Sequence, residues 1–297
     1  MKKYILVLLS IPFFLISCSD SDEKITYIPS SKTISIKSYK LGIHPYLNSK
    51  KMYRFYRPIL DHVESKVGNI EIILETSANY AEYNIKLYRG DFDFSLPNPF
   101  QTYNSLSKGY TVIGRMKPDS VFRGIFVTRK DSNIKTPSQL KGKKVSFPAP
   151  TALAATMMPL YYLYEHGIDV KNDIKKKYVG SQDSSILNSF TSDTIVGATW
   201  PPPWETWKKE NPQKAKKMEV VWETESLINN GFVVKEGIDS NITKKIIDIL
   251  VNLDETQEGK RLLNEAGFEG FTKSTNEDYN VVSEFLVKYD KAIGIPK

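Results

Sequence analysis

The chain has 297 residues, of which 40% are hydrophobic and 12% aromatic, so it can bury a sizeable core, and its length suggests two lobes rather than one. Its formal charge of +7 falls to +5 once Lys2 and Lys3, which lie in a predicted leader, are set aside. This mild and dispersed basic balance argues against a dedicated nucleic-acid-binding surface.

The first 17 residues are predicted to be a lipoprotein signal peptide. Two lysines precede an apolar run at residues 4–16, which is too short to span a bilayer comfortably. The run ends in Leu15-Ile-Ser-Cys18, which resembles a bacterial lipobox and implies cleavage before Cys18 and attachment of lipid to its sulfur. An uncleaved signal anchor is the alternative. We therefore expect an extracytoplasmic protein, in the periplasm or at the cell surface, lipid-anchored to the membrane through a flexible tether at residues 18–32.

Strands and helices alternate from residue 34 onward. The hydrophobic pattern predicts a strand at residues 34–43, a helix at 53–67, a strand at 70–75, a helix at 80–89 and a strand at 92–96. Further strands are predicted near 122–128, 143–145, 177–179, 194–198, 220–222 and 231–234, and further helices at 136–142, 160–166, 183–190, 243–253, 258–266 and 278–289. This alternation predicts an α/β fold in which residues 121–224 form a lobe inserted into another lobe, made of residues 33–120 and 225–297.

Residues 146–159 are the stretch that most resembles a binding element. They follow an apolar strand and lead into a helix that ends at Gly167, with Thr151 as the expected N-cap and Pro159 in the first turn. A turn of small residues leaves backbone N–H groups uncovered, where the oxygen of a ligand could meet them. The alternative is a strand-to-helix joint packed with alanine.

An ordered set of short motifs runs through nearly the whole mature chain. These are Gly42-Ile-His-Pro45, Tyr56-Arg-Pro58, Tyr80, Gly90-Asp-Phe-Asp93, Leu96-Pro-Asn-Pro99, Phe122-Arg123, Leu140-Lys-Gly-Lys-Lys-Val145, the turn from Pro150 to Pro159, and Gly180-Ser-Gln-Asp183. In this order they resemble the PhnD-like solute-binding proteins of phosphate, phosphite and phosphonate ABC transporters. The resemblance implies the two-lobed type II periplasmic binding protein fold, with a ligand cleft between the lobes, closure by a hinge, and an ABC permease and ATPase as partners.

The chain departs from that family at several expected ligand contacts. Where the family presents Ser-Thr-Ser followed by Gly, this chain has Ala152-Leu-Ala-Ala155, and Gln182 replaces a histidine. An acidic residue expected near Ile195 is missing, and a Gly-Pro pair is replaced by Leu96-Pro97. Each departure removes a hydroxyl, a charge or a close backbone approach, and charge-assisted hydrogen bonds are the strong ones.

The chain has aromatic side chains near the expected cleft where these polar contacts are lost. Trp200, Trp204 and Trp207 follow a predicted strand whose carboxyl end should face the cleft, and Tyr46, Tyr53 and Phe122 would face it from the other side. Such groups suit a flat ring, an apolar organic molecule or a quaternary cation. Packing of the tryptophan-proline segment as a small surface core is the alternative. Trp200 is the tryptophan most expected to touch a ligand.

These considerations predict a ligand-binding set, with Cys18 as the lipidation site. Its members are Tyr46, Tyr53, Pro97, Asn98, Phe122, Arg123, Thr151, Ala152, Ala154, Thr156, Gln182, Asp183 and Trp200. No catalytic residue, metal or cofactor is predicted, because the three histidines lack metal-ligand spacing, and no Gly-x-Ser-x-Gly, Walker or Gly-x-Gly-x-x-Gly sequence occurs.

The predicted function is that of a monomeric solute-binding lipoprotein of an ABC importer, with a pocket that is more aromatic and less anion-specific than the family's. The ligand stays open between a phosphonate or phosphate and a neutral, aromatic or cationic organic molecule, with a slight preference for the organic molecule. A ligand-sensing lipoprotein of the same fold that reports to a membrane receptor is the alternative function.

Overall fold

The computed structural model describes residues 36–296. The predicted signal peptide, Cys18 and the predicted tether lie outside these described residues. Within residues 36–296, no helix combines the length and the apolar character needed to cross a membrane. The strands of this part of the chain form two separate sheets, and the predicted α/β fold is confirmed.

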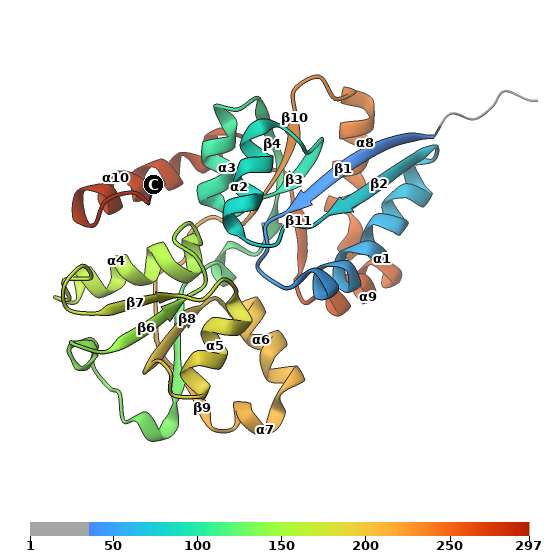
Figure 1. Cartoon of the computed structure of the whole chain (residues 1–297). Coiled ribbons are helices and arrows are strands. Elements are labelled where there is room, and N and C mark those ends of the chain that lie inside the picture. The colour runs from blue at the N-terminus through green and yellow to red at the C-terminus, as the bar shows by residue number, and fades with distance from the viewer. Residues whose placement is uncertain (1–35, 297) are drawn as a thin grey trace, which may run out of the picture. The chain divides into compact units, whose positions relative to one another are not determined.

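The first sheet, at the upper right of Figure 1, has the strand order β11-β4-β10-β3-β1-β2 and mixes parallel with antiparallel pairs. Helix α1 contacts both α8 and α9 on one side of it, and α2 and α3 lie together on the other. Its strands are β1 (Lys37–Ile43), β2 (Ile70–Glu75), β3 (Phe94–Leu96), β4 (Tyr110–Lys117), β10 (Gly231–Lys235) and β11 (Gly270–Thr272). The helices of this half are α1 (Ser49–Val67), α2 (Tyr80–Arg89), α3 (Pro99–Leu106), α8 (Ser240–Val251), α9 (Gln257–Ala266) and α10 (Asn280–Ala292).

The second sheet has the order β7-β6-β8-β5-β9, and α5 packs against β5, β6 and β8. Its strands are β5 (Ile125–Arg129), β6 (Lys144–Phe147), β7 (Lys175–Tyr178), β8 (Val196–Thr199) and β9 (Met218–Glu223). Its helices are α4 (Met158–Glu165), α5 (Gln182–Phe190), α6 (Pro201–Glu210) and α7 (Pro212–Ala215). A short 3-10 helix (Pro137–Leu140) precedes β6, as the sequence predicts for residues 136–142.

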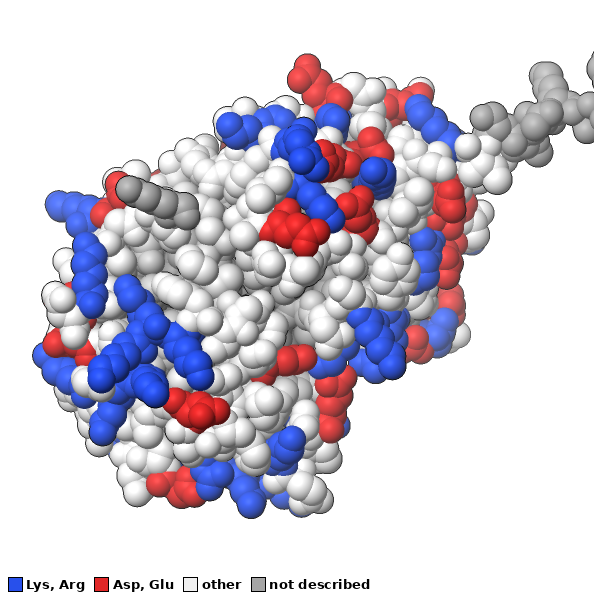
Figure 2. All heavy atoms as spheres, viewed as in Figure 1, with Lys and Arg blue, Asp and Glu red and all other residues white. Residues whose placement is uncertain are grey.

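The outer strand β7 carries three exposed lysines, Lys175 to Lys177, and Lys144 of β6 lies directly opposite Lys175. Figure 2 shows basic side chains gathered over this edge of the second sheet. Lysines on an edge strand hinder edge-to-edge pairing with another chain, which accounts for a charge run at this place.

Local sequence explains where the helices begin and end. Helix α1 begins after Asn48, whose side chain accepts from the Lys51 N–H, and it ends at Gly68 with φ 73°. Its buried face includes Met52, Phe55 and Ile59, at the three- and four-residue spacing of an amphipathic helix. The helix therefore starts four residues before the predicted start at residue 53.

The segment Trp200-Pro-Pro-Pro-Trp204, which falls outside the predicted helices, is the start of helix α6. Trp200 is the residue before the helix and Pro201 occupies its first position, where a proline loses no hydrogen bond and its fixed φ suits the helix. Helix α3 was missed for the same reason: Asn98 caps it and Pro99 is its first residue. Strands β4 and β11 are also absent from the predicted elements.

Thr151 is not an N-cap, contrary to prediction. A π-helical turn (Leu153–Met157) starts after Ala152, has no side-chain cap and runs directly into α4, so the helical stretch covers residues 153–165. Pro159 does lie in the first turn of α4, as predicted, and Gly167 has the positive φ of 77° expected beyond a helix end.

The chain passes between the two sheets at residues 118–124 and 224–230, and these two segments are hydrogen-bonded to each other. Leu227 N–H donates to the Phe122 carbonyl (2.9 Å), and Thr224 N–H donates to the Gly124 carbonyl (2.9 Å). The Asn229 side chain donates to the Pro118 carbonyl (2.9 Å). The predicted lobe boundaries at residues 121 and 225 fall within these segments, and the lobe assignment stays a prediction.

Candidate functional site

A small cavity lies where residues from both halves of the fold meet. Its volume is about 10 Å³, and every residue that lines it is buried. The lining residues are His44, Tyr80 and Asn98 from the half of the first sheet, Phe122 from a crossing segment, and Ala152, Leu153, Ala154, Ala155, Gln182 and Trp200 from the half of the second sheet. None of these side chains is an acid, a lysine or an arginine.

His44 lies just beyond the end of β1 and is held as a neutral imidazole. Its Nδ1 is 2.9 Å from the Leu96 carbonyl oxygen, which can only accept, so Nδ1 carries the hydrogen. Burial lowers the pKa of His44 to about 4, although the hydrogen bond to Leu96 acts in the opposite direction. Nε2 is therefore an unprotonated acceptor at neutral pH, and it has no hydrogen-bond partner within residues 36–296.

Gln182 and Tyr80 join the two halves across the cavity. Thr199, at the end of β8, donates to Gln182 Oε1 (2.8 Å), which fixes the amide so that its nitrogen points to Tyr80. Gln182 Nε2 donates to the Tyr80 hydroxyl oxygen (3.2 Å). Burial raises the pKa of the Tyr80 phenol well above its ordinary value, so the phenol keeps its proton. One hydrogen on each side chain remains to be donated.

The lip at residues 152–155 presents backbone donors. Thr156 and Met157 both donate to the Ala152 carbonyl (2.8 and 3.2 Å), whereas the N–H groups of Leu153, Ala154 and Ala155 have no acceptor in the described part of the chain. The first N–H groups of a helix lack intrahelical partners, and they attract anions. The lip is held from the other half, because Asn98 Nδ2 donates to the Thr151 carbonyl (3.0 Å).

Aromatic rings close the cavity on the side of Trp200. The Trp200 ring is 5.7 Å from that of Tyr46 and 5.5 Å from that of Phe122, and only 2% of Trp200 is exposed. Trp200 also lines a second cavity of about 120 Å³, together with Pro118, Val121 and Phe268. Its side chain thus borders both spaces.

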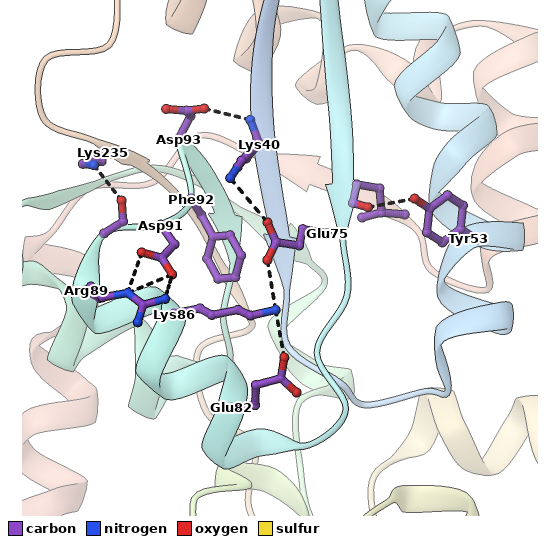
Figure 3. A network of polar contacts seen from close by, with 12 residues as sticks. Lys40, Tyr53, Glu75, Glu82, Lys86, Arg89, Asp91, Phe92, Asp93 and Lys235 are labelled. Atoms are coloured by element: carbon purple, nitrogen blue, oxygen red, sulfur yellow. Dashed lines mark hydrogen bonds and ion pairs between the residues drawn. The ribbon is translucent and has the colours of Figure 1, made fainter.

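Helix α2, which carries Tyr80, is fastened to the first sheet by ion pairs outside the cavity. Lys86 Nζ lies 2.9 Å from a Glu75 oxygen at the end of β2 and 2.8 Å from Glu82, and Lys40 on β1 reaches the same Glu75 at 4.0 Å (Figure 3). The network ties β1, β2 and α2 together and so fixes the helix whose first residue is Tyr80.

A second ionic cluster, which we call the ionic bridge, joins the two halves beside the cavity. Lys51 of α1 contacts Asp183 of α5 (2.8 Å) and Glu210 of α6 (2.7 Å), and Arg54 of α1 contacts the same Glu210 (3.1 Å). Asp183 directly follows Gln182, so the ionic bridge anchors the helix end that carries Gln182 into the cavity.

The structure brings six of the predicted ligand-binding residues together around the cavity: Asn98, Phe122, Ala152, Ala154, Gln182 and Trp200. Tyr46 stands behind them, with its ring against His44 and Trp200 and its hydroxyl bonded to that of Tyr56 (2.9 Å). Pro97 and Thr151 are neighbours in sequence of lining residues, and Asp183 points to Lys51.

Three predicted residues lie elsewhere. Tyr53, expected to face the cleft, is 47% exposed and donates to the Leu74 carbonyl (2.9 Å; Figure 3). Arg123 pairs with Glu223 (2.6 Å) and donates to the Ser120 carbonyl (2.7 Å), away from the lining residues. Thr156 is buried, and its hydroxyl has no partner in residues 36–296.

His44, Tyr80, Leu153 and Ala155 line the cavity but were not in the predicted set. His44 and Tyr80 did stand in the motifs that carried the family resemblance, so that signal was available. Trp204 and Trp207 stack on each other (5.5 Å) in a small core with Ile186 and Met218, as the alternative interpretation of the tryptophan segment predicts for these two.

Comparison with known proteins gives consistent matches. A family model described as "ABC transporter, phosphonate, periplasmic substrate-binding protein" matches residues 41–279. A probable ABC transporter phosphite-binding protein, PhnD1, of Prochlorococcus marinus (strain MIT 9301) is 28% identical over 206 residues, which cover 64% of this chain and 67% of that protein.

Two solved structures resemble the fold. A binding-protein component of an ABC phosphonate transporter from Pseudomonas aeruginosa has a TM-score of 0.79 at 14% identity, over 86% of this chain and 87% of that one. Prochlorococcus PhnD1, solved in complex with methylphosphonate, has a TM-score of 0.78 at 20% identity, over 86% and 99%. At these identities the likeness establishes the type II periplasmic binding protein fold.

Proposed function

The chain belongs to the family of periplasmic substrate-binding proteins of phosphonate ABC transporters, and from this premise we propose that it captures a small oxyanion outside the cytoplasm for an ABC importer. Members of this family bind a substrate for a transporter and are not enzymes. The solute would bind in the cavity between the two sheets, and an ABC permease with its ATPase would receive it.

The observation that carries this proposal is the set of unpaired hydrogen-bonding groups that converge on one buried cavity from both halves of the fold. The N–H groups of residues 153–155 come from one half, and Tyr80 and His44 come from the other. A solute that contacts both sets favours the closed arrangement, because only that arrangement offers all of the contacts. Closure would then report to the permease that the site is loaded.

The pocket we propose is more aromatic and less specific for anions than that of the family. The lining includes Trp200 and Phe122 but no cationic side chain, and alanines stand where the family is expected to present hydroxyls. Neutral donors still make charge-assisted hydrogen bonds to an oxyanion, but they bring no positive charge to offset the second negative charge of a dianion. We therefore expect weaker binding of doubly charged oxyanions than a cationic pocket would give.

The cavity does not select a ligand class by its size. Its volume of about 10 Å³ holds about one water molecule, so a bound solute has to displace part of the lining. The proposed preference for a small phosphonate-type oxyanion rests on the converging hydrogen-bond donors and not on the volume.

The first test is binding. We expect methylphosphonate or phosphate to raise the melting temperature of the purified protein, since a ligand at 100 times its dissociation constant adds about 2.7 kcal/mol. Aminoethylphosphonate, aromatic metabolites and quaternary ammonium compounds complete the panel. Stabilisation only by compounds without an oxyanion would overturn the proposed ligand class. Uptake of the stabilising solute by membranes that contain the permease and ATPase, with and without the protein, separates transport from sensing.

Anchoring by lipid is a separate part of the proposal. If Cys18 carries the lipid, Cys18→Ser should leave a protein that is unprocessed or released from the membrane, whereas the parent chain stays membrane-bound. Radiolabelled palmitate measures the modification directly. Normal labelling of the Cys18→Ser variant would contradict the lipobox assignment.

A further inference from the structure

The proposed binding cavity has an unequal balance of hydrogen-bonding groups. The donors are the free N–H groups of residues 153–155, the Tyr80 hydroxyl, the second amide hydrogens of Gln182 and Asn98, and the Trp200 indole N–H. Against these stands one unpaired side-chain acceptor among the lining residues, His44 Nε2. A ligand that pairs all of these groups must therefore have several acceptor oxygens and one hydrogen to donate.

No charge near His44 alters this balance. The titratable side chains that face its ring are the phenols of Tyr46, Tyr80 and Tyr83, and burial raises the pKa of each, so all three are neutral at physiological pH. The residues that line the cavity from the other half are also uncharged. Asp183, the acid next to Gln182, is paired with Lys51.

Resting on the proposed function, we propose that this cavity selects the singly protonated, monoanionic form of a phosphonate-type ligand, whose P–OH donates to His44 Nε2. The remaining oxygens accept from the helical lip and from Tyr80 and Gln182. A monoanion of this kind has acceptor oxygens for these donors and the one hydrogen that the imidazole requires.

The fully ionised dianion does not fit the same groups. It has no hydrogen to donate, so one of its oxygen lone pairs would face the lone pair of Nε2, and a buried acceptor without a donor is costly. It would also bring a second negative charge into a buried space that contains no cation. The dianion can enter only together with a proton, placed on the ligand or on the imidazole, and the overall proton count is then the same.

This proton count fixes the pH dependence. Above the second pKa of the free ligand, each unit of pH should weaken the apparent affinity about tenfold, because one proton is taken up on binding. Below that pKa and above about 4, where His44 is neutral, the affinity should be constant. Protons are thus expected to be absorbed from the buffer at pH 8 and not at pH 5.5.

Titration calorimetry tests this on the unmodified protein. Methylphosphonate is titrated between pH 5.5 and 8.5 in pairs of buffers with different ionisation enthalpies, which gives the number of protons taken up. Methanesulfonate is the matched probe, because it has the same tetrahedral shape and a single charge at every pH but never carries a hydrogen. We expect it to bind about tenfold more weakly than methylphosphonate at pH 5.5, with no pH dependence.

The variant His44→Gln provides the second measurement, with its folding checked by its melting curve. The glutamine amide can turn to donate as well as accept, so the dependence of methylphosphonate affinity on pH should become shallower. A flat profile in the parent protein, with no proton uptake at pH 8, would overturn this inference and leave the proposed function intact. Failure of methylphosphonate, phosphate and methanesulfonate to bind at any pH would overturn both.

Discussion

The cavity and the ionic bridge join the same two halves of the fold with opposite chemistry. The ionic bridge uses Lys51 and Arg54 on one side and Asp183 and Glu210 on the other, at 2.7–3.1 Å. The cavity, beside Asp183, is lined by neutral groups only. The charges that hold the halves together are thus paired within the protein, and the groups left for a ligand are uncharged. Recognition and closure are therefore separable by mutation.

Two groups of the ionic bridge, Lys51 and Glu210, are stabilised in their ionised forms. Burial alone would raise the pKa of Glu210, but the hydrogen bonds from Lys51 and Arg54 lower it overall. Burial alone would lower the pKa of Lys51, but Asp183 and Glu210 raise it overall. Lys51 and Glu210 are accordingly charged across the neutral range, whereas burial with little compensation keeps His44 uncharged.

A charge placed inside the cavity should have the largest effect. In Ala154→Asp, the new carboxylate would lie beside the free N–H groups and repel an anionic ligand where no cation offsets it. Two like charges 4 Å apart near a protein surface repel by about 4 kcal/mol, so we expect at least a 100-fold loss of methylphosphonate affinity. Ala154→Asn, of nearly the same size, is the control. Equal losses in both variants would show that bulk rather than charge is responsible.

Removal of the Trp200 ring should have the second-largest effect on ligand affinity. Trp200→Ala takes away a ring that borders both cavities and contacts Tyr46 and Phe122. We expect at least a tenfold loss of affinity for methylphosphonate, measured by calorimetry, and a smaller loss for phosphonates with longer side chains, because the two spaces would be joined. Unchanged affinity for both would assign Trp200 a purely structural role.

Two tyrosines in the same half provide a matched pair of smaller changes. Tyr80→Phe removes a hydroxyl from the cavity and should weaken methylphosphonate binding about fivefold to tenfold, the value of one hydrogen bond. Tyr53→Phe removes a hydroxyl that bonds the Leu74 carbonyl and should cost about 1 kcal/mol of stability or less, with affinity unchanged. A loss of affinity in Tyr53→Phe would contradict the placement of the site.

Substitution in the ionic bridge should have the smallest effect on affinity. Lys51→Met keeps the aliphatic chain and leaves Asp183 without its cation, so the closed arrangement loses about 1 kcal/mol and binding weakens severalfold. Lys50→Met, at an exposed neighbour, is the control. Because the pKa of Glu210 is lowered, the contribution is present above the ordinary pKa of a glutamate and is lost as pH falls through the lowered value. Affinity of Lys51→Met and the parent should therefore converge in acid.

The sequence could predict most of the elements and one wall of the site, because those depend on local pattern. Gln182 and Trp200 each stand at a helix start, where position follows from the preceding turn or strand. His44 was harder to predict, because the carbonyl that sets its tautomer belongs to Leu96, 52 residues away. The protonation and hydrogen bonding of a single histidine depend on such long-range contacts, and the local pattern of the sequence does not show them.

The misplaced residues have geometric causes. The buried face of α1 includes Met52, Phe55 and Tyr56, and Tyr53 lies outside this face and is exposed. Phe122 and Arg123 are adjacent in a crossing segment, and the buried side chain of Phe122 lines the cavity while that of Arg123 reaches Glu223. The missed helix α3 and the misread start of α6 share one signal, a proline in the first helical position, which could have been used.

The hydrogen bonds between the two crossing segments limit how the halves can move. Since residues 118–124 and 224–230 are bonded to each other through Leu227, Thr224 and Asn229, one segment cannot bend without the other. We infer that the two halves rotate relative to each other about a single axis and populate few intermediate conformations. The distance between two fluorescent labels, one on each half, would then take one value in the empty protein and another in the loaded protein. A permease could distinguish the loaded from the empty protein by the same difference in shape.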